Sequence, residues 1–140
     1  MALALEYMHL VPGMALPNQN EAPPVKVVVI AEADVAPDWQ RSVSDWIVRS
    51  GCFYMMAWGA GCSSWDDAVD LANLQRFDFG DVPEEQFVIT TWHEGELLQE
   101  VFWHSKHLAK HPKVQMDRTL ILHISAAPRE EELKTAYAAA

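Results

Sequence analysis

The stretch "VKVVVIA", residues 25–31, decides the fold, because six of its seven residues are apolar and four of them are valine. A run of β-branched residues without polar alternation predicts a strand buried on both faces of a parallel sheet. Directly after it, "PDWQRSVSDWIVRSG" (37–51) begins with proline, ends with glycine and repeats its apolar residues at helical spacing. A buried strand followed by such a helix is typical of α/β proteins.

The same alternation continues to the C-terminus. Further strands are expected at 52–58, 87–92 and 119–125, and further helices at 63–77, 96–111 and 128–140. Four strands alternating with four helices predict an α/β fold, a three-layer sandwich with a mostly parallel four-stranded sheet and helices on both faces. By analogy with other doubly wound sheets, we expect the strand order 2-1-3-4, counting residues 25–31 as strand 1.

The N-terminal residues differ from the rest in composition. Residues 12–24 contain four prolines and a glycine, which predicts an irregular connector. We therefore divide the chain into an N-terminal appendage with its connector (1–24) and a single α/β domain (25–140). An extra strand is expected at 5–11 within the appendage.

The charge of the chain is strongly negative and unevenly distributed. Twenty acidic residues face ten Lys and Arg, giving a formal net charge of −10, which argues against nucleic acid as a partner. Residues 66–100 hold ten of the acids and a single base, whereas 104–118 hold four bases, three histidines and one acid. The sequence therefore predicts a dipolar surface.

The chain contains no apolar run of the roughly 18 residues that a membrane-spanning helix needs, so we expect a cytoplasmic protein without a membrane partner. Cys52 and Cys62 would lie at opposite ends of one strand, about 20 Å apart at about 3.3 Å per residue. A disulfide needs Cα atoms within about 7 Å, so both are expected to be free thiols.

Ligands of open α/β sheets bind at the carboxyl ends of the strands, where the strand order reverses. With the order 2-1-3-4, that point brings Glu32 and Asp34 beside His93 and Glu94. Glu32, Asp34 and His93 could hold a divalent metal, and the same groups could act as a general acid and base. The structural alternative is that the acids are solvated loop residues. Cys62, just before a helix, is a candidate nucleophile that His93 could activate.

The stretch "GAGCSS" (59–64) allows two interpretations. It lacks the third glycine of the dinucleotide fingerprint, so the match to that motif is weak. In the structural interpretation, Gly59 and Gly61 adopt positive φ and Ser64 forms a capping box with Asp67. In the functional one, Gly59, Gly61, Ser63 and Ser64 cradle an anion at the start of the helix.

Three histidines fall on one side of the helix expected at 96–111. His104, His107 and His111 lie opposite its apolar face, which predicts a solvated stripe rather than a metal site. His123, inside an apolar strand, is expected to be a hydrogen-bonded core residue. Trp103 falls off the inward face and is expected to be exposed, as residues of protein interfaces are.

The segments "VSDWIVRSGCFYMMAWGAGCSSWDDAVDLANLQRFDFG" (43–80) and "TTWHEGELLQEVFWHSKH" (90–107) resemble an uncharacterised family of small bacterial proteins. The resemblance covers most of residues 25–140. It implies a bacterial, cytoplasmic protein of unknown function and supplies no catalytic residues.

Two classes of function remain. We favour a binding, interaction or accessory protein with a polar crevice at the C-terminal edge of the sheet, because the chain is acidic and contains no complete catalytic motif. Its partner would be a protein with a basic surface, with a small-molecule ligand as the alternative. The second class is a metal-assisted hydrolase or a glycosyl or deoxyribosyl transferase that acts on a nucleotide or sugar through Glu32, Asp34, His93 and Glu94. The sequence does not identify a cofactor, although the acidic and histidine side chains are compatible with a divalent metal.

Overall fold

A computed structural model describes residues 4–18 and 22–140 of the chain. Its strands are β1 (Ala4–Leu10), β2 (Val25–Ala31), β3 (Cys52–Gly59), β4 (Ile89–Trp92) and β5 (Arg118–Ile124). Its helices are α1 (Pro37–Arg49), α2 (Cys62–Gln75), α3 (Leu98–His107) and α4 (Glu130–Ala139), with a short 3-10 helix, η1 (Glu84–Gln86). None of the helices in the described ranges is long and apolar enough to cross a membrane.

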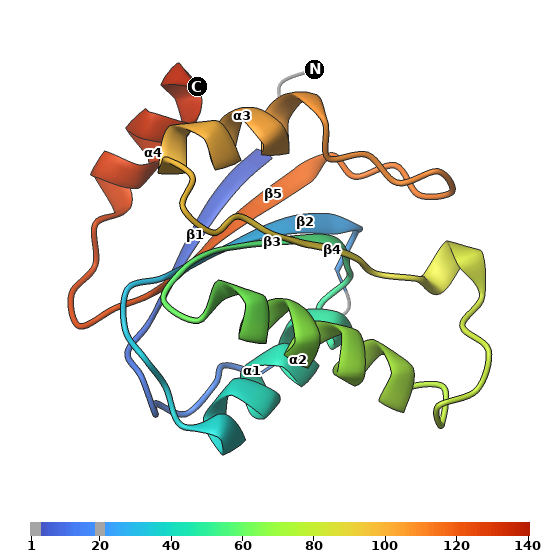
Figure 1. Cartoon of the computed structure of the whole chain (residues 1–140). Helices are drawn as coiled ribbons and strands as arrows, with labels where there is room; N and C mark the ends of the chain where they lie inside the picture. The colour runs from blue at the N-terminus through green and yellow to red at the C-terminus, as the bar shows by residue number, and fades with distance from the viewer. Residues whose placement is uncertain (1–3, 19–21) are drawn as a thin grey trace.

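The strands form one parallel sheet in the order β1-β5-β2-β3-β4 (Figure 1). The α/β class and the parallel sheet with helices on both faces are therefore confirmed. The expected sheet of four strands in the order 2-1-3-4 is wrong, because the sheet has five strands and the four expected ones stand in the order 4-1-2-3. The fifth is the N-terminal strand β1, which pairs along its whole length with β5. The division at residue 24 stays a prediction.

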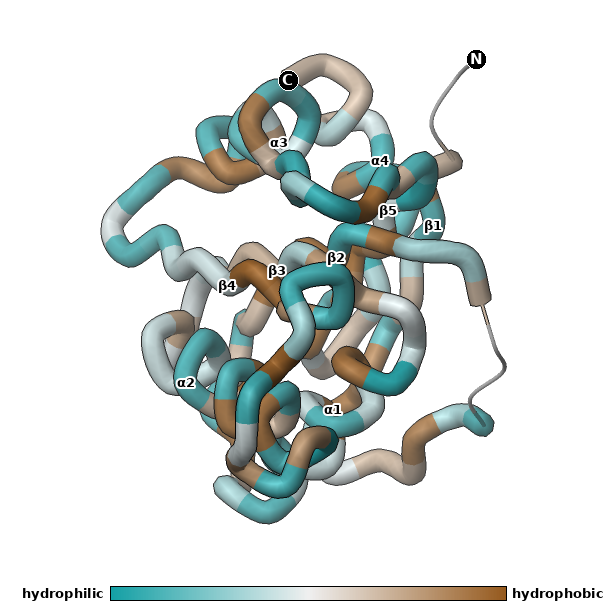
Figure 2. The backbone as a smooth tube through the Cα atoms, turned by 90° about the vertical axis from the view of Figure 1, so that its right-hand side faces the viewer, coloured by the Kyte–Doolittle hydropathy of each residue, from teal (hydrophilic) through white to brown (hydrophobic). Residues whose placement is uncertain are grey.

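The direction of the crossovers explains the order. The chain steps from β2 to β3 and from β3 to β4 in the same direction, and right-handed crossovers then place both connecting helices on one face of the sheet. Accordingly, α1 and α2 lie together on one face, and α3 returns across the other face to β5 (Figures 1 and 2). The strand order therefore reverses between β2 and β5.

The core has one layer on each face of the sheet. Val27 and Val29 pack with residues of α1 and α2, whereas Val28 and Ile30 pack with residues of α3 and α4. All seven residues of β2 are buried, as its apolar composition predicts. Cys52 and Cys62 are both buried free thiols, which confirms the expected absence of a disulfide between them.

Helix α2 begins earlier than expected. Its N-cap is Gly61 in the left-handed conformation (φ 64°), and no side chain caps the helix. Ser64 therefore lies inside the first turn, where its hydroxyl donates to Oε1 of Gln40 (3.1 Å). The capping box of Ser64 with Asp67 is wrong, because a glycine with positive φ starts the helix without a side-chain cap.

Candidate functional site

The structure does not bring Glu32 and Asp34 together with His93 and Glu94. The first two follow β2 and the last two follow β4, and β3 lies between these strands. The expected crevice between them is therefore wrong. Within residues 4–18 and 22–140, no group of three or more His, Cys, Asp or Glu is placed to hold a metal ion, so the set Glu32, Asp34 and His93 is not assembled. A functional role for each residue alone stays a prediction.

Glu32 belongs to a hydrogen-bonded network at the true reversal point, between β2 and β5. Its carboxylate accepts from Nε2 of His123 and from the guanidinium of Arg129. Nδ1 of His123 accepts from the hydroxyl of Tyr7 (2.7 Å), and that oxygen accepts from the backbone N–H of Arg129 (3.0 Å). The expectation that His123 is a hydrogen-bonded core residue is confirmed, since it is fully buried.

This network joins the middle of β1 and the C-terminal ends of β2 and β5 to the start of α4. Partial burial of Glu32 opposes its ionisation, but hydrogen bonds from Arg129 and His123 outweigh this effect and hold the pKa of Glu32 below its usual value. Each group in the ring has a partner, so the network is suited to fixing the fold at this edge. Arg129 and Tyr7 were not identified from the sequence, because they lie far from Glu32 along the chain.

His93 belongs to a second cluster, on the α3 side of β4. Its Nε2 contacts the hydroxyl of Thr91 (2.8 Å) and its Nδ1 contacts the carboxylate of Glu96 (2.9 Å). The ring of His104 lies edge-on to that of His93, 4.9 Å away, and bonds the hydroxyl of Tyr54 (3.0 Å). A hydroxyl, an imidazole and a carboxylate in this order can pass a proton. His93 is only 5% exposed, which leaves little access for a substrate.

The expected solvated histidine stripe is correct for His107, which is exposed on α3, and wrong for His104 and His111. His104 is half-buried, and its burial and the neighbouring His93 lower its pKa. Helix α3 ends at His107, which packs against the ring of Trp103. His111 therefore lies beyond the helix, where Nε2 bonds the carbonyl of Phe87 (2.8 Å). Trp103 is exposed, as expected.

The glycines of the stretch 59–64 serve backbone geometry. Gly59 and Gly61 have positive φ (98° and 64°), as predicted. A Cβ on Gly59 would lie well under 3.0 Å from the carbonyl oxygen of Ala31, so β3 and β2 approach closely at this point. Ser63 and Ser64 are exposed on the first turn of α2. An anion cradle formed by these four residues stays a prediction.

The proposed pairing of Cys62 with His93 is not formed. Cys62 is buried in the core layer between the sheet and helices α1 and α2. His93 instead packs against His104 of α3, on the opposite face of the sheet. The strand alternation that separates these faces also separates the thiol from the imidazole.

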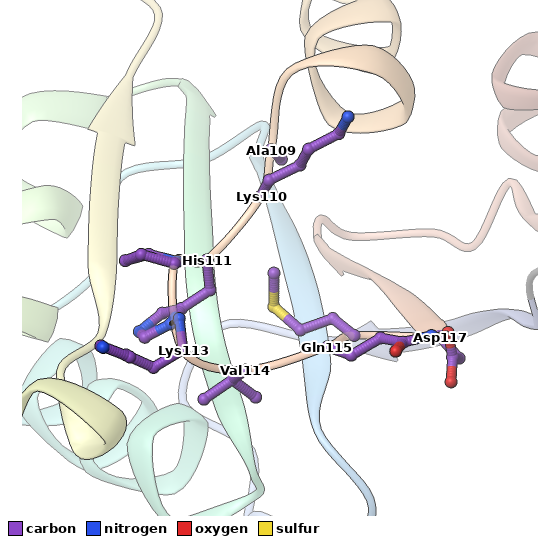
Figure 3. Close-up of a pocket in the computed structure, with 9 residues that line it drawn as sticks. Ala109, Lys110, His111, Lys113, Val114, Gln115 and Asp117 are labelled. Atoms are coloured by element: carbon purple, nitrogen blue, oxygen red, sulfur yellow. Dashed lines mark hydrogen bonds between the residues drawn. The ribbon is translucent and has the colours of Figure 1, made fainter.

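The segment 104–118, which is rich in basic residues, ends in a loop before β5, and this loop lines a cavity of about 510 Å³. Residues 109–117 contribute to it, including Lys110, Lys113 and Asp117 (Figure 3). In Figure 3 the side chains of Lys110 and Lys113 point away from one another. The two cations therefore do not converge on one ligand.

The acidic segment, residues 66–100, contributes most of a second surface, which we call the β4 face. We define the β4 face as the exposed residues of α2, of the segment 76–88, of β4 and of the turn after β4. Figure 1 shows β4 at the front edge of the sheet with α2 beneath it. In the described part of the chain, ten large apolar side chains are exposed, and six of them belong to this face: Leu71, Leu74, Phe79, Phe87, Trp92 and Leu97. None of the described ion pairs with a lysine or arginine involves an acid of residues 66–100.

A groove runs between α2 and β4 on this face. It has a volume of about 360 Å³ and is lined by Asp70, Asn73, Leu74, Phe87, Ile89 and Thr90. A second hollow of about 300 Å³ shares Phe87 and Ile89 with it and continues to Glu84. The two hollows are therefore neighbours, with Asp70 lining the first and Glu84 and His111 lining the second.

Comparison with known proteins gives a family but no function. No curated protein and no solved structure matches the chain. Residues 5–140, which include all five strands and all four helices except the first residue of β1, match a family described as a domain of unknown function, DUF7684. The resemblance to an uncharacterised family is therefore confirmed, and the chain belongs to the DUF7684 family.

Proposed function

We propose that this protein is a binding protein, and that its β4 face docks a partner protein with a basic surface. One observation carries the proposal: six of the ten exposed large apolar side chains of the described residues fall within the segment that holds half of the acids. Exposed aromatic and aliphatic side chains within a polar rim are the usual composition of a protein interface.

The charge of the face supports a basic partner. The acids of residues 66–100 are opposed by one base in the same segment, Arg76. An uncompensated acidic surface attracts a basic protein over distances of about one Debye length, roughly 8 Å at physiological salt. We therefore expect the rate of association to fall as the salt concentration rises.

The enzymatic alternative is not the function that we propose. It required Glu32, Asp34, His93 and Glu94 to line one crevice, and β3 separates the two pairs. The favoured location of the binding surface also changes, from the polar crevice to the β4 face.

Two exposed tryptophans provide a matched test of the proposal. Trp92 on the β4 face is 52% exposed, and Trp103 on α3 is 49% exposed. A protein that copurifies with the tagged chain would be identified, expressed and purified, and its binding measured by calorimetry to wild type, Trp92→Ala and Trp103→Ala. Truncating a central interface tryptophan costs about 2 kcal/mol or more, so we expect Trp92→Ala to weaken binding by about thirtyfold.

The control should change affinity by less than about twofold, since residues outside an interface contribute little. The partner should be basic, and raising the salt concentration should weaken the wild-type complex. A partner that is acidic, or one that is lost with Trp103→Ala and retained with Trp92→Ala, would refute the proposal.

A further inference from the structure

Two carboxyl groups of α2 meet behind the groove between α2 and β4. Asp66 and Asp70 are one helical turn apart, and the hydroxyl of Thr90 donates to Oδ1 of Asp70 (2.7 Å). Asp70 lines the groove, whereas Asp66 is only 5% exposed. Among the described residues, Oδ2 of Asp66 is a buried oxygen without a hydrogen-bond partner.

An orphaned carboxylate oxygen beside a second carboxylate is electrostatically unfavourable. Burial raises the pKa of Asp66, and repulsion from Asp70 and Asp67 together with a side-chain hydrogen bond to Asp70 raises it further, while the hydroxyl of Thr90 acts in the opposite direction. Buried polar atoms in native proteins nearly always have a partner, so this oxygen needs an explanation. A cation that bound Asp70 in the groove would relieve the repulsion between Asp70 and Asp66.

The walls of the groove select the kind of cation. Leu74, Phe87 and Ile89 provide apolar surface, and Asp70 provides the charge. Asn73 holds one wall in place, because its Oδ1 accepts from the N–H of Val88 (3.0 Å). An apolar channel that ends in a carboxylate fits a side chain with an aliphatic stem and a charged head, as Lys and Arg have.

We propose that this groove is a binding site for a lysine or arginine side chain, presented by the basic partner and held by Asp70 with Asp66 behind it. This inference rests on the proposed function, since it names how the partner would anchor on the β4 face. A bare metal ion fits less well, because the described residues offer no group of three acidic, His or Cys ligands. A second copy of the chain would bring two acidic faces together, which is unfavourable.

Small probes test the groove without the partner. Nα-acetyl-arginine and Nα-acetyl-lysine N-methylamides would be titrated into the labelled protein, with the norleucine derivative as an uncharged control, while amide NMR signals of Asp70 and Thr90 are followed. We expect saturable shifts with both cations, with dissociation constants on the order of millimolar, and none with norleucine. Hydrogen bonds to charged groups contribute about 1.5–3 kcal/mol, so Asp70→Asn should weaken binding by about tenfold or more.

Asp81→Asn is the matched control, because it removes the same charge from an exposed position in the same acidic segment that lines neither hollow. It should change probe affinity by less than about twofold, as expected for an exposed, screened charge. Leu74→Lys is a second variant, at a position that already tolerates solvent, and its ammonium should occupy the groove and block both probes.

Three results would overturn the assignment: equal shifts with the norleucine control, unchanged affinity in Asp70→Asn, or equal weakening in Asp81→Asn. The two proposals can fail separately. If the purified partner depends on Trp92 but not on Asp70, the groove is not the anchor and the β4 face remains the interface. If the probes bind through Asp70 but Trp92→Ala leaves the affinity for the partner unchanged, the groove is a cation site and the proposed function is wrong.

Discussion

Replacing Gly59 and Gly61 by alanine, one at a time, separates the free-energy cost of a positive φ from the cost of a steric clash with the Cβ atom. Gly59 and Gly61 both have positive φ, but they differ in what a Cβ would meet. At Gly61 nothing lies within 4 Å, whereas at Gly59 the carbonyl of Ala31 is far too close. That carbonyl also accepts the N–H of Ala60 (2.8 Å), so it cannot move away without breaking a bond between adjacent strand ends.

The expected costs follow from this difference. A non-glycine residue with left-handed backbone costs about 1–2 kcal/mol, which is the whole effect expected for Gly61→Ala. Gly59→Ala adds a clash with backbone atoms, and overpacking typically costs about 1–3 kcal/mol more. The total for Gly59→Ala is therefore about 2–5 kcal/mol, a large share of the roughly 5–15 kcal/mol that stabilises a domain.

Urea unfolding followed by circular dichroism measures both variants. With a slope of about 2 kcal/mol/M, Gly59→Ala should lower the midpoint by about 1–2.5 M and Gly61→Ala by about 0.5–1 M. If Gly59→Ala cost no more than Gly61→Ala, the close approach of β3 to β2 would not be what requires the glycine, and the structural interpretation of this stretch would be refuted.

Three further predictions concern buried or partly buried titratable groups. The pKa of Glu32 is lowered from its ordinary value of 4.5, so ionised Glu32 stabilises the fold at pH values above 4.5, and this contribution is lost as the pH falls through the folded pKa. Glu32→Gln should therefore flatten the decline in thermal stability between pH 6 and pH 3. The raised pKa of Asp66 makes its ionised form costly, so Asp66→Asn should add about 1 kcal/mol of stability at pH 7 and nothing below pH 3.8, as urea unfolding at both pH values would measure. Burial raises the pKa of Cys52 to about 12, and Cys62 is also buried. We therefore expect neither thiol to react with a disulfide reagent at pH 8 until the protein is unfolded. Rapid labelling of Cys62 in the folded protein would instead support its role as a nucleophile.

The local elements could be predicted because each depends on neighbouring residues. The apolar run of β2, the proline that begins α1 and the positive φ of Gly59 and Gly61 all follow from short-range chemistry. The start of α2 was misplaced because a serine and an aspartate at the right spacing suggested a cap, whereas Gly61 in the left-handed conformation precedes the helix.

The strand order could not be obtained in this way, since it depends on which crossovers share a face of the sheet. One signal was present in the sequence: the strand expected at 87–92 contains Thr90 and Thr91, which suits an edge strand better than a central one. Placing β4 at the edge would have separated His93 from Glu32. The partners of Glu32 then follow from the order, because His123 lies on the strand beside β2.

Hydrogen exchange on the complex with the purified partner tests the β4 face most directly. If the account is correct, the partner slows amide exchange in α2, β4 and the segment between them, and it leaves the exposed surface of α3 unchanged. Protection confined to the Trp103 side of α3, or to the Glu32 network, would contradict it.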